Sequence, residues 1–119
     1  MGTNFYGIIK NSGIDVSVHL GKRSAGWEFC HRGARGEIET RRQWIDRLLT
    51  FNRIENQYHD EVDIEEMVHI STVGCPIEGR PLLKDDEHSE HTTPEAVRFY
   101  RDNGWRDGEG YYFLDAGFS

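Results

Sequence analysis

The stretch His19-Leu-Gly-Lys-Arg-Ser-Ala-Gly-Trp-Glu-Phe29 decides the fold that the sequence predicts. Apolar residues alternate on both sides of its centre: one face carries Val16, Val18 and Leu20 in the first run and Trp27 and Phe29 in the second. A period of two is typical of β-strands, and Gly21 and Gly26 favour a turn between the two runs. The stretch therefore predicts a β-hairpin whose loop carries Lys22 and Arg23.

Further strands are expected toward both ends of the chain. Residues 4–10 alternate weakly and run into Asn11-Ser12-Gly13, which is a turn-forming sequence. Residues 110–114 alternate between two faces, with Tyr111 and Phe113 on one and Tyr112 and Leu114 on the other. Each of these patterns predicts one strand.

Helices are expected where capping residues precede apolar residues at helical spacing. Thr40 and Gln43 fit a capping box, in which each side chain hydrogen-bonds the other residue's backbone N–H. The helix that follows places four apolar residues on one side, namely Trp44, Ile45, Leu48 and Leu49. Asp63 is expected to cap a second helix that ends near Ile70.

A third helix is expected to begin after Thr93, which is followed by a proline, and to end at Asn103-Gly104. Between the first two helices, residues 52–61 are mostly polar. We predict a packed loop there, with Ile54 and Tyr58 as its apolar anchors.

Together these elements predict a single α+β domain over residues 1–119. Its expected architecture is a small, mostly antiparallel sheet of three to four strands with about three short helices packed on one face. A chain of 119 residues is long enough to bury one hydrophobic core. Prolines, glycines and acidic side chains concentrate in residues 74–92, which favours an exposed acidic loop.

The charge balance narrows the classes of partner. The chain has 21 acidic against 14 basic side chains, a formal net charge of -7. This charge opposes binding along a nucleic-acid backbone, where affinity comes from neutralising phosphates, and it favours a basic protein surface. No apolar run approaches the ~20 residues of a membrane span, and the N-terminus lacks a secretory signal. The cytoplasm is therefore the expected compartment, with Cys30 and Cys75 as reduced thiols.

Four parts of the sequence resemble the same group of proteins. They are the opening Met1-Gly-Thr-Asn-Phe-Tyr6, the hairpin stretch from His19 to Phe29, the helix that contains Trp44, and the close formed by Gly110-Tyr-Tyr-Phe113 and Gly117-Phe-Ser119. Together they resemble a group of small bacteriophage-encoded proteins of uncharacterised function. Members of that group often carry a Cys-x-x-Cys pair after the opening, whereas residues 11–15 here contain no cysteine. The resemblance implies a phage origin, and the cysteine difference argues against an inherited zinc site.

The hairpin residues His19, Lys22 and Arg23 are candidates for binding an anion, because two cations and an imidazole are close together in the sequence. The sequence Gly21-Lys-Arg-Ser24 differs from a true phosphate loop, which needs GxxxxGK[ST] between a strand and a helix. The alternative interpretation is an ordinary solvated turn.

His69 and His91 each fit the short pattern H-x-[ST]. In two-histidine phosphoesterases such residues act as the base and the acid, so this pair is the alternative catalytic set, to be weighed against a chance match. His88 and His91, within the acidic loop, are the alternative metal ligands. Otherwise the sequence predicts no catalytic residue, metal or cofactor.

Large aromatic residues favour a protein interface. The last part of the chain has more large rings than a small strand can hide entirely, namely Trp105, Tyr111, Tyr112, Phe113 and Phe118, although some of them are expected in the core. Trp and Tyr are enriched at binding hot spots, so the candidate contact residues are Trp27, Trp105, Tyr111 and Tyr112. The leading hypothesis is a phage-type accessory protein that binds a host or defence protein without catalysis. Two alternatives stay open: a small phosphoester hydrolase or nucleotide-binding protein that uses the histidines and the hairpin cations, and a structural or virion-associated protein. Self-association into a homo-oligomer is open as well.

Overall fold

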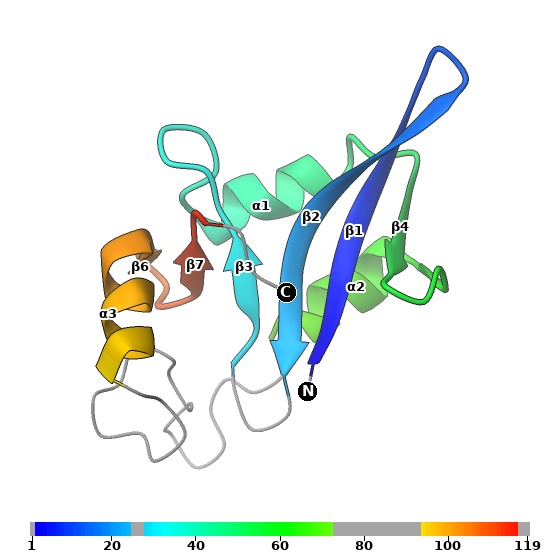
Figure 1. Cartoon of the computed structure of the whole chain (residues 1–119). Helices are drawn as coiled ribbons and strands as arrows, with labels where there is room; N and C mark the ends of the chain where they lie inside the picture. Colours follow the sequence, from blue (N-terminus) through cyan, green and yellow to red (C-terminus); the bar gives the residue numbers. More distant parts are fainter. Residues whose placement is uncertain (1, 25–27, 73–93, 117–119) are drawn as a thin grey trace.

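The computed structural model describes residues 2–24, 28–72 and 94–116. A seven-stranded sheet forms its centre, in the order β5-β4-β1-β2-β3-β7-β6 (Figure 1). The strands are β1 Gly2–Asn11, β2 Ile14–Ser24, β3 Cys30–Arg32, β4 Arg53–Asn56, β5 Glu61–Val62, β6 Gly104–Arg106 and β7 Tyr112–Leu114. β3 and β7 pair in parallel and the other neighbouring strands pair antiparallel, so the sheet is mixed.

The prediction of a mostly antiparallel sheet of three to four strands is wrong. The strands β4, β5 and β6 are only two to four residues long, which is too short to show a clear alternation in the sequence. β4 and β5 lie in residues 52–61, where the sequence predicts a loop. β4 forms because it pairs with the outer edge of β1, a long-range contact that local patterns do not reveal. Ile54 is buried as expected, but Tyr58 is 66% exposed and anchors nothing.

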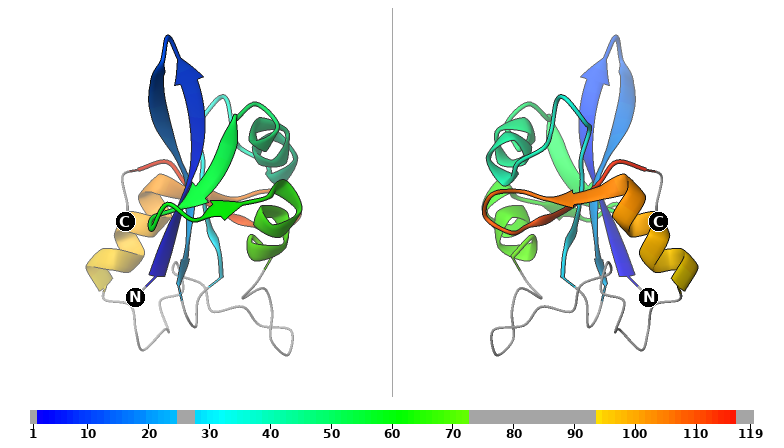
Figure 2. Two further views of the ribbon diagram at one scale, coloured as in Figure 1. Left: turned by 90° about the vertical axis from the view of Figure 1, so that its right-hand side faces the viewer. Right: turned by 90° about the vertical axis from the view of Figure 1, so that its left-hand side faces the viewer.

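Two helices cover one face of the sheet, and the third lies on the other side (Figure 2). α1 spans Arg41–Leu48, α2 spans Ile64–Ile70 and α3 spans Pro94–Asn103. α3 runs directly into β6 at the edge of the sheet, opposite the face that α1 and α2 cover. The prediction that all three helices pack on one face is therefore wrong. The period of a helix identifies its apolar side but not the face of the sheet that receives it.

The predicted starts of α1 and α2 are confirmed. The Thr40 side chain accepts a hydrogen bond from the Gln43 N–H at 3.2 Å, and the Gln43 side chain accepts one from the Thr40 N–H at 3.1 Å. Asp63 caps α2 by accepting from the Glu66 N–H at 2.8 Å. Leu49 does not join the core as expected, because it is the C-cap of α1 and is 67% exposed.

The main core lies between the sheet and the helices α1 and α2. Its buried residues are Phe5, Leu20, Phe29, Trp44, Leu48, Ile54, Val62, Met67 and Phe113. A smaller cluster contains Cys30, Tyr112 and Leu114. The alternation predicted for the last strand is confirmed, since Phe113 and Tyr112 fall in different clusters. Cys30 is a buried thiol.

The tight hairpin of the structure joins β1 to β2 and projects beyond the rest of the molecule (Figures 1 and 2). Its turn is formed by Ser12 and Gly13, which have φ angles of 53° and 81°. The antiparallel pairing predicted across residues 16–29 is confirmed in part, because β2 pairs with β3 through Gly21 and Lys22. The sequence predicts a loop over residues 21–26. This prediction is wrong for residues 21–24, because β2 continues to Ser24.

Several predicted features lie outside the described residues. They are the third helix's cap Thr93, the acidic loop at 74–92, Trp27, Cys75, His88 and His91. The expectations for these residues stay predictions.

Candidate functional site

A β-bulge in β2 brings His19 and Lys22 to the same face of the sheet. β1 pairs Asn4 with Lys22 and Tyr6 with His19, and the register shifts between these two pairs. Alternate residues of a strand share a face, and so do cross-strand partners. In a regular strand, residues three apart have side chains on opposite faces. The bulge at Leu20 and Gly21 adds one residue to β2, so the side chains of His19 and Lys22 lie on the same face. The anion-binding hypothesis for His19 and Lys22 stays a prediction.

Arg23 does not join this face. It is exposed, and it pairs with Thr3, whose side chain points to the opposite side from that of Asn4. The sequence places Lys22 and Arg23 together at the tip of a loop, and this placement is wrong. Both residues lie within β2, so their side chains leave opposite faces of the strand.

His19 is part of a hydrogen-bonded chain that joins β2 to β1 and to Gln57, the residue that follows β4. Its Nε2 lies 2.8 Å from Asn4 Oδ1, and Asn4 Nδ2 donates to Gln57 Oε1 at 3.2 Å. Because Asn4 Oδ1 can only accept, His19 Nε2 carries the proton. Burial, with the positive charges of Arg32 and Lys22, lowers the pKa of His19 to about 4, although the Gly21 backbone acts in the opposite direction. His19 is therefore a neutral hydrogen-bond donor at pH 7.

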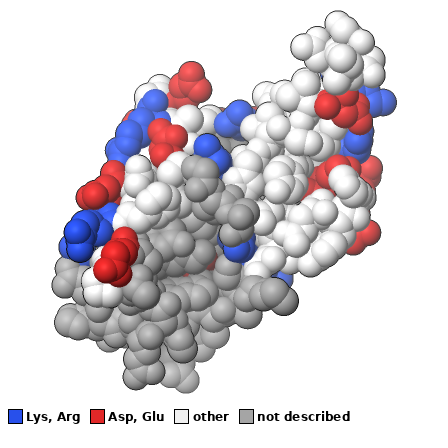
Figure 3. Space-filling view, in the orientation of Figure 1, with Lys and Arg blue, Asp and Glu red and all other residues white. Residues whose placement is uncertain are grey.

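The face of the sheet opposite α1 and α2 carries charged side chains in several places (Figure 3). Acidic and basic atoms gather over α3 on the left and along the right-hand edge near β4, and separate basic atoms lie near the middle of the view. Uncharged atoms cover most of β1 and β2.

His69 lies away from the other candidate residues. It is an exposed residue of α2, which covers the face of the sheet opposite His19 and Lys22. The structure therefore does not bring these three side chains to a shared ligand. The pairing of His69 with His91 stays a prediction because His91 lies outside the described residues. Within residues 2–24, 28–72 and 94–116, no three His, Cys, Asp or Glu side chains gather as metal ligands would.

The aromatic candidates pack inside the protein more than the sequence predicts. Tyr112 is 1% exposed, so the expectation that it belongs to a surface patch is wrong. Tyr111 is half-buried, with the Arg41 guanidinium 4.3 Å from its ring centre. Trp105 is also half-buried; it stacks on Phe113 at 5.9 Å and donates its Nε1–H to the Glu39 carbonyl oxygen at 2.9 Å. A partner contact for Trp105 and Tyr111 stays a prediction.

His31 is a buried polar residue whose role the sequence interpretation missed. Its Nδ1–H donates to the Tyr112 carbonyl oxygen at 3.0 Å, and its Nε2 accepts from Arg41 Nη1 at 3.2 Å. Burial and the positive charge of Arg41 lower the pKa of His31 to about 3. His31 and Phe29 are two residues apart in an extended segment, so the alternation that predicts a buried Phe29 also predicts a buried His31.

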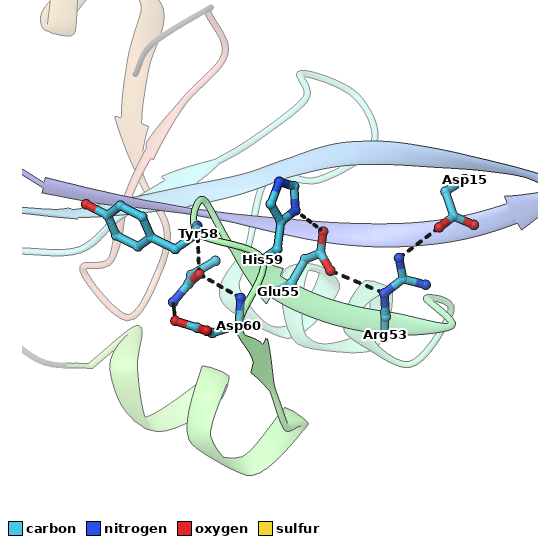
Figure 4. Close-up of polar contacts among 7 residues, drawn as sticks. Asp15, Arg53, Glu55, Tyr58, His59 and Asp60 are labelled. Carbon is cyan, nitrogen blue, oxygen red and sulfur yellow. Dashed lines mark hydrogen bonds and ion pairs between the residues drawn. The ribbon is translucent and has the colours of Figure 1, made fainter.

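A chain of ion pairs joins Asp15, near the end of the projecting hairpin, to β4 (Figure 4). Arg53 Nη2 lies 2.8 Å from Asp15 Oδ2, and Arg53 Nε lies 3.2 Å from Glu55 Oε2. Glu55 also accepts from His59 Nδ1 at 3.1 Å. The hydrogen bond from Arg53 lowers the pKa of Asp15, and the one from His59 contributes most to lowering the pKa of Glu55. These contacts hold the hairpin in one direction relative to the sheet.

The hairpin exposes aliphatic side chains on its outer part. Ile14 is 68% exposed and Val16 is 44% exposed. Both lie on the same face as Leu20, which is buried beneath α1, but they extend past the helices. The alternation of residues 16–20 predicts the shared face of Val16 and Leu20 correctly. The exposure of Val16 follows from the projection of the hairpin, which the sequence pattern does not show.

An open pocket of about 490 Å³ lies between the end of α1, β4, β5 and the start of α2. Its apolar lining comes from Leu48, Phe51, Ile54, Val62 and Ile64. Since β4 and β5 are not recognisable in the sequence, this pocket is not predictable from it either.

Comparison with known protein families, with curated protein sequences and with solved structures gives no match. Among the helices in the described ranges, none combines the length and the apolar character needed to cross a membrane.

Proposed function

We propose that this chain is a phage-type accessory protein that works without catalysis, by binding a host or defence protein in the bacterial cytoplasm. The observation that carries the proposal is the projecting β1–β2 hairpin. Its outer part presents Ile14 and Val16 to solvent, although burial of such side chains is what normally stabilises a strand.

The hairpin is suited to binding because its direction is fixed. Its second-outermost pair, Lys10 with Asp15, is held from the side: Asp15 forms an ion pair with Arg53 of β4 at 2.8 Å, and the Lys10 N–H donates to Asn52 Oδ1 at 2.8 Å. An interface element that is already ordered loses little conformational entropy on binding. The apolar residues on one face of the hairpin can therefore contribute most of their burial energy to affinity.

The net charge of -7 favours a partner with a basic surface. Complementary charge raises the association rate and disfavours acidic competitors. The apolar hairpin then provides the desolvated contacts that slow dissociation.

The proposal is tested by affinity capture from a bacterial lysate with the wild-type protein and the double variant Ile14→Ser/Val16→Ser. Wild type should retain a partner at micromolar concentration, and the variant should lose it while keeping its thermal stability, because both side chains are exposed. The matched control Tyr58→Ser/Phe99→Ser, which changes two exposed aromatic residues outside the hairpin, should retain the partner.

Capture of nothing by wild type, or equal capture by wild type and the hairpin variant, would contradict the proposal. Light scattering on the same samples measures the oligomeric state of the wild type and of the variant. A dimer of the wild type that is absent in Ile14→Ser/Val16→Ser would assign the hairpin to self-association and overturn the proposal.

A further inference from the structure

We infer that the pocket between α1, β4, β5 and α2 receives one large apolar side chain from a basic segment of a partner protein, with lysine or arginine residues on either side of it. This inference rests on the proposed function and specifies the chemistry of the partner.

The pocket has an apolar floor of suitable size. Leu48, Ile54 and Val62 form its deepest part and are buried, while Phe51 and Ile64 are partly accessible at its mouth. A volume of about 490 Å³ lies within the range of about 300–1,000 Å³ that is common for ligand pockets. Insertion of a leucine or aromatic side chain would cover the parts of Phe51 and Ile64 that are now in contact with water.

The rim of the pocket is acidic. Asp63 and Glu65 contribute to its lining and are both exposed. Glu61 and Arg53 also line the pocket, but their side chains leave the other face of the sheet, since Glu61 pairs with Glu55 and Arg53 pairs with Ile8. Arg53 bridges Asp15 and Glu55 there, at 2.8 and 3.2 Å. Lysine or arginine residues that flank an inserted apolar side chain would therefore meet carboxylates.

The pocket is continuous with the hairpin through Phe51. A Cβ atom placed on Gly7, in the inner part of β1, would overlap the Phe51 ring, so this ring packs directly on the hairpin base. Phe51 also lines the pocket. A single partner can thus contact the exposed aliphatic residues of the hairpin and fill the pocket.

The negative charge of the chain and of the pocket rim distinguishes between the possible occupants of the pocket. A second copy of this chain carries the same net charge of -7, and an anionic ligand would face the carboxylates of Asp63 and Glu65, so both would be repelled. A basic protein segment meets both the apolar floor and the acidic rim.

The test uses the full chain and a fluorescein-labelled peptide that has three lysines on each side of one leucine, with fluorescence anisotropy as the readout. The variant Glu65→Gln should raise the dissociation constant about threefold. The matched control Glu109→Gln removes one exposed carboxylate away from the pocket and should leave the dissociation constant unchanged within measurement error.

A second peptide, with glycine in place of the leucine, isolates the pocket from general attraction between charges. It should bind more weakly than the leucine peptide, by roughly fivefold or more, since it leaves the accessible apolar surface of Phe51 and Ile64 in water. Equal affinity for the two peptides, equal effects of Glu65→Gln and Glu109→Gln, or lack of binding by wild type would overturn the inference. Partner capture that depends on Ile14 and Val16 would still support the proposed function, so the two failures are distinguishable.

Discussion

At the scale of single residues, the most constrained side chain is His31. It lies among the rings of Phe29, Trp44 and Phe113, with centres at 4.9, 4.7 and 4.7 Å, and its two ring nitrogens have fixed partners. The carbonyl of Tyr112 can only accept and the guanidinium of Arg41 can only donate, so the neutral Nδ1–H tautomer satisfies both. A second proton on His31 would place two cations 3.2 Å apart and leave two donors facing each other.

The stability of the protein should therefore fall as the pH is lowered. The pKa of His31 is about 3 in the folded chain, against the ordinary histidine value of 6.5, so the unfolded chain binds more protons between these two pH values. His31 lowers the free energy of unfolding by up to about 1.4 kcal/mol for each pH unit below 6.5.

The variant His31→Gln tests this expectation, since a glutamine amide can donate to Tyr112 and accept from Arg41. Urea unfolding at several pH values should show the stability advantage of wild type over His31→Gln shrinking from pH 7 to pH 4. His19, whose pKa is also lowered, titrates in both proteins and cancels in the difference. If the difference in the free energy of unfolding between wild type and His31→Gln did not change with pH, the neutral state assigned to His31 would be contradicted.

At the scale of elements, the bulge of β2 depends on Gly21. This residue has a φ of 156°, and a Cβ atom there would lie 2.5 Å from both the Cys30 carbonyl oxygen and the Phe29 ring. Only glycine fits, and the bulge in turn places His19 and Lys22 on one face of the sheet.

Gly21→Ala should lower the free energy of unfolding by about 2 kcal/mol or more, because the new methyl group strains the backbone and displaces a core ring. Gly108→Ala is the matched control, since a Cβ atom at that position meets no atom within 4 Å, and it should change stability by less than about 0.5 kcal/mol. Urea unfolding curves of the two variants would show the contrast. Similar stability of both would mean that β2 tolerates a regular register.

The sequence predicts elements well where their signals are local. The capping residues Thr40 and Asp63 locate two helices, and the alternation of Tyr112 and Phe113 identifies the last strand. The short strands β4 and β5 could not be found, because their pairing energy comes from β1 and from each other rather than from their own residues. The pocket that they line was missed for the same reason.

At the scale of the whole molecule, the end of the β1–β2 hairpin projects away from the core (Figure 1). Its outermost pairs are Lys10 with Asp15 and Asn11 with Ile14, and neither pair includes a residue of the buried core. The sequence predicts a strand and a turn at residues 4–13 but not this projection, which depends on where the helices end along the sheet.

Replacement of residues 11–14 by Asn-Gly, a favoured two-residue hairpin turn, should therefore change the free energy of unfolding by less than about 0.5 kcal/mol. It should also abolish capture of the partner, since it removes Ile14. Urea unfolding and the lysate capture experiment measure the two effects. A large loss of stability would show that the hairpin belongs to the cooperative core.

The parallel pairing of β3 with β7 has a consequence for the order of folding. The hydrogen bond between His31 and Tyr112 joins residues separated by 81 positions along the chain, whereas the β1–β2 hairpin closes over a two-residue turn. Loop-closure entropy delays distant contacts relative to local ones. During synthesis on a ribosome, the first half of the sheet can therefore assemble before β7 is made. In this nascent intermediate, the His31 ring and the Cys30 thiol are not yet covered, and chaperones would bind the exposed apolar surface.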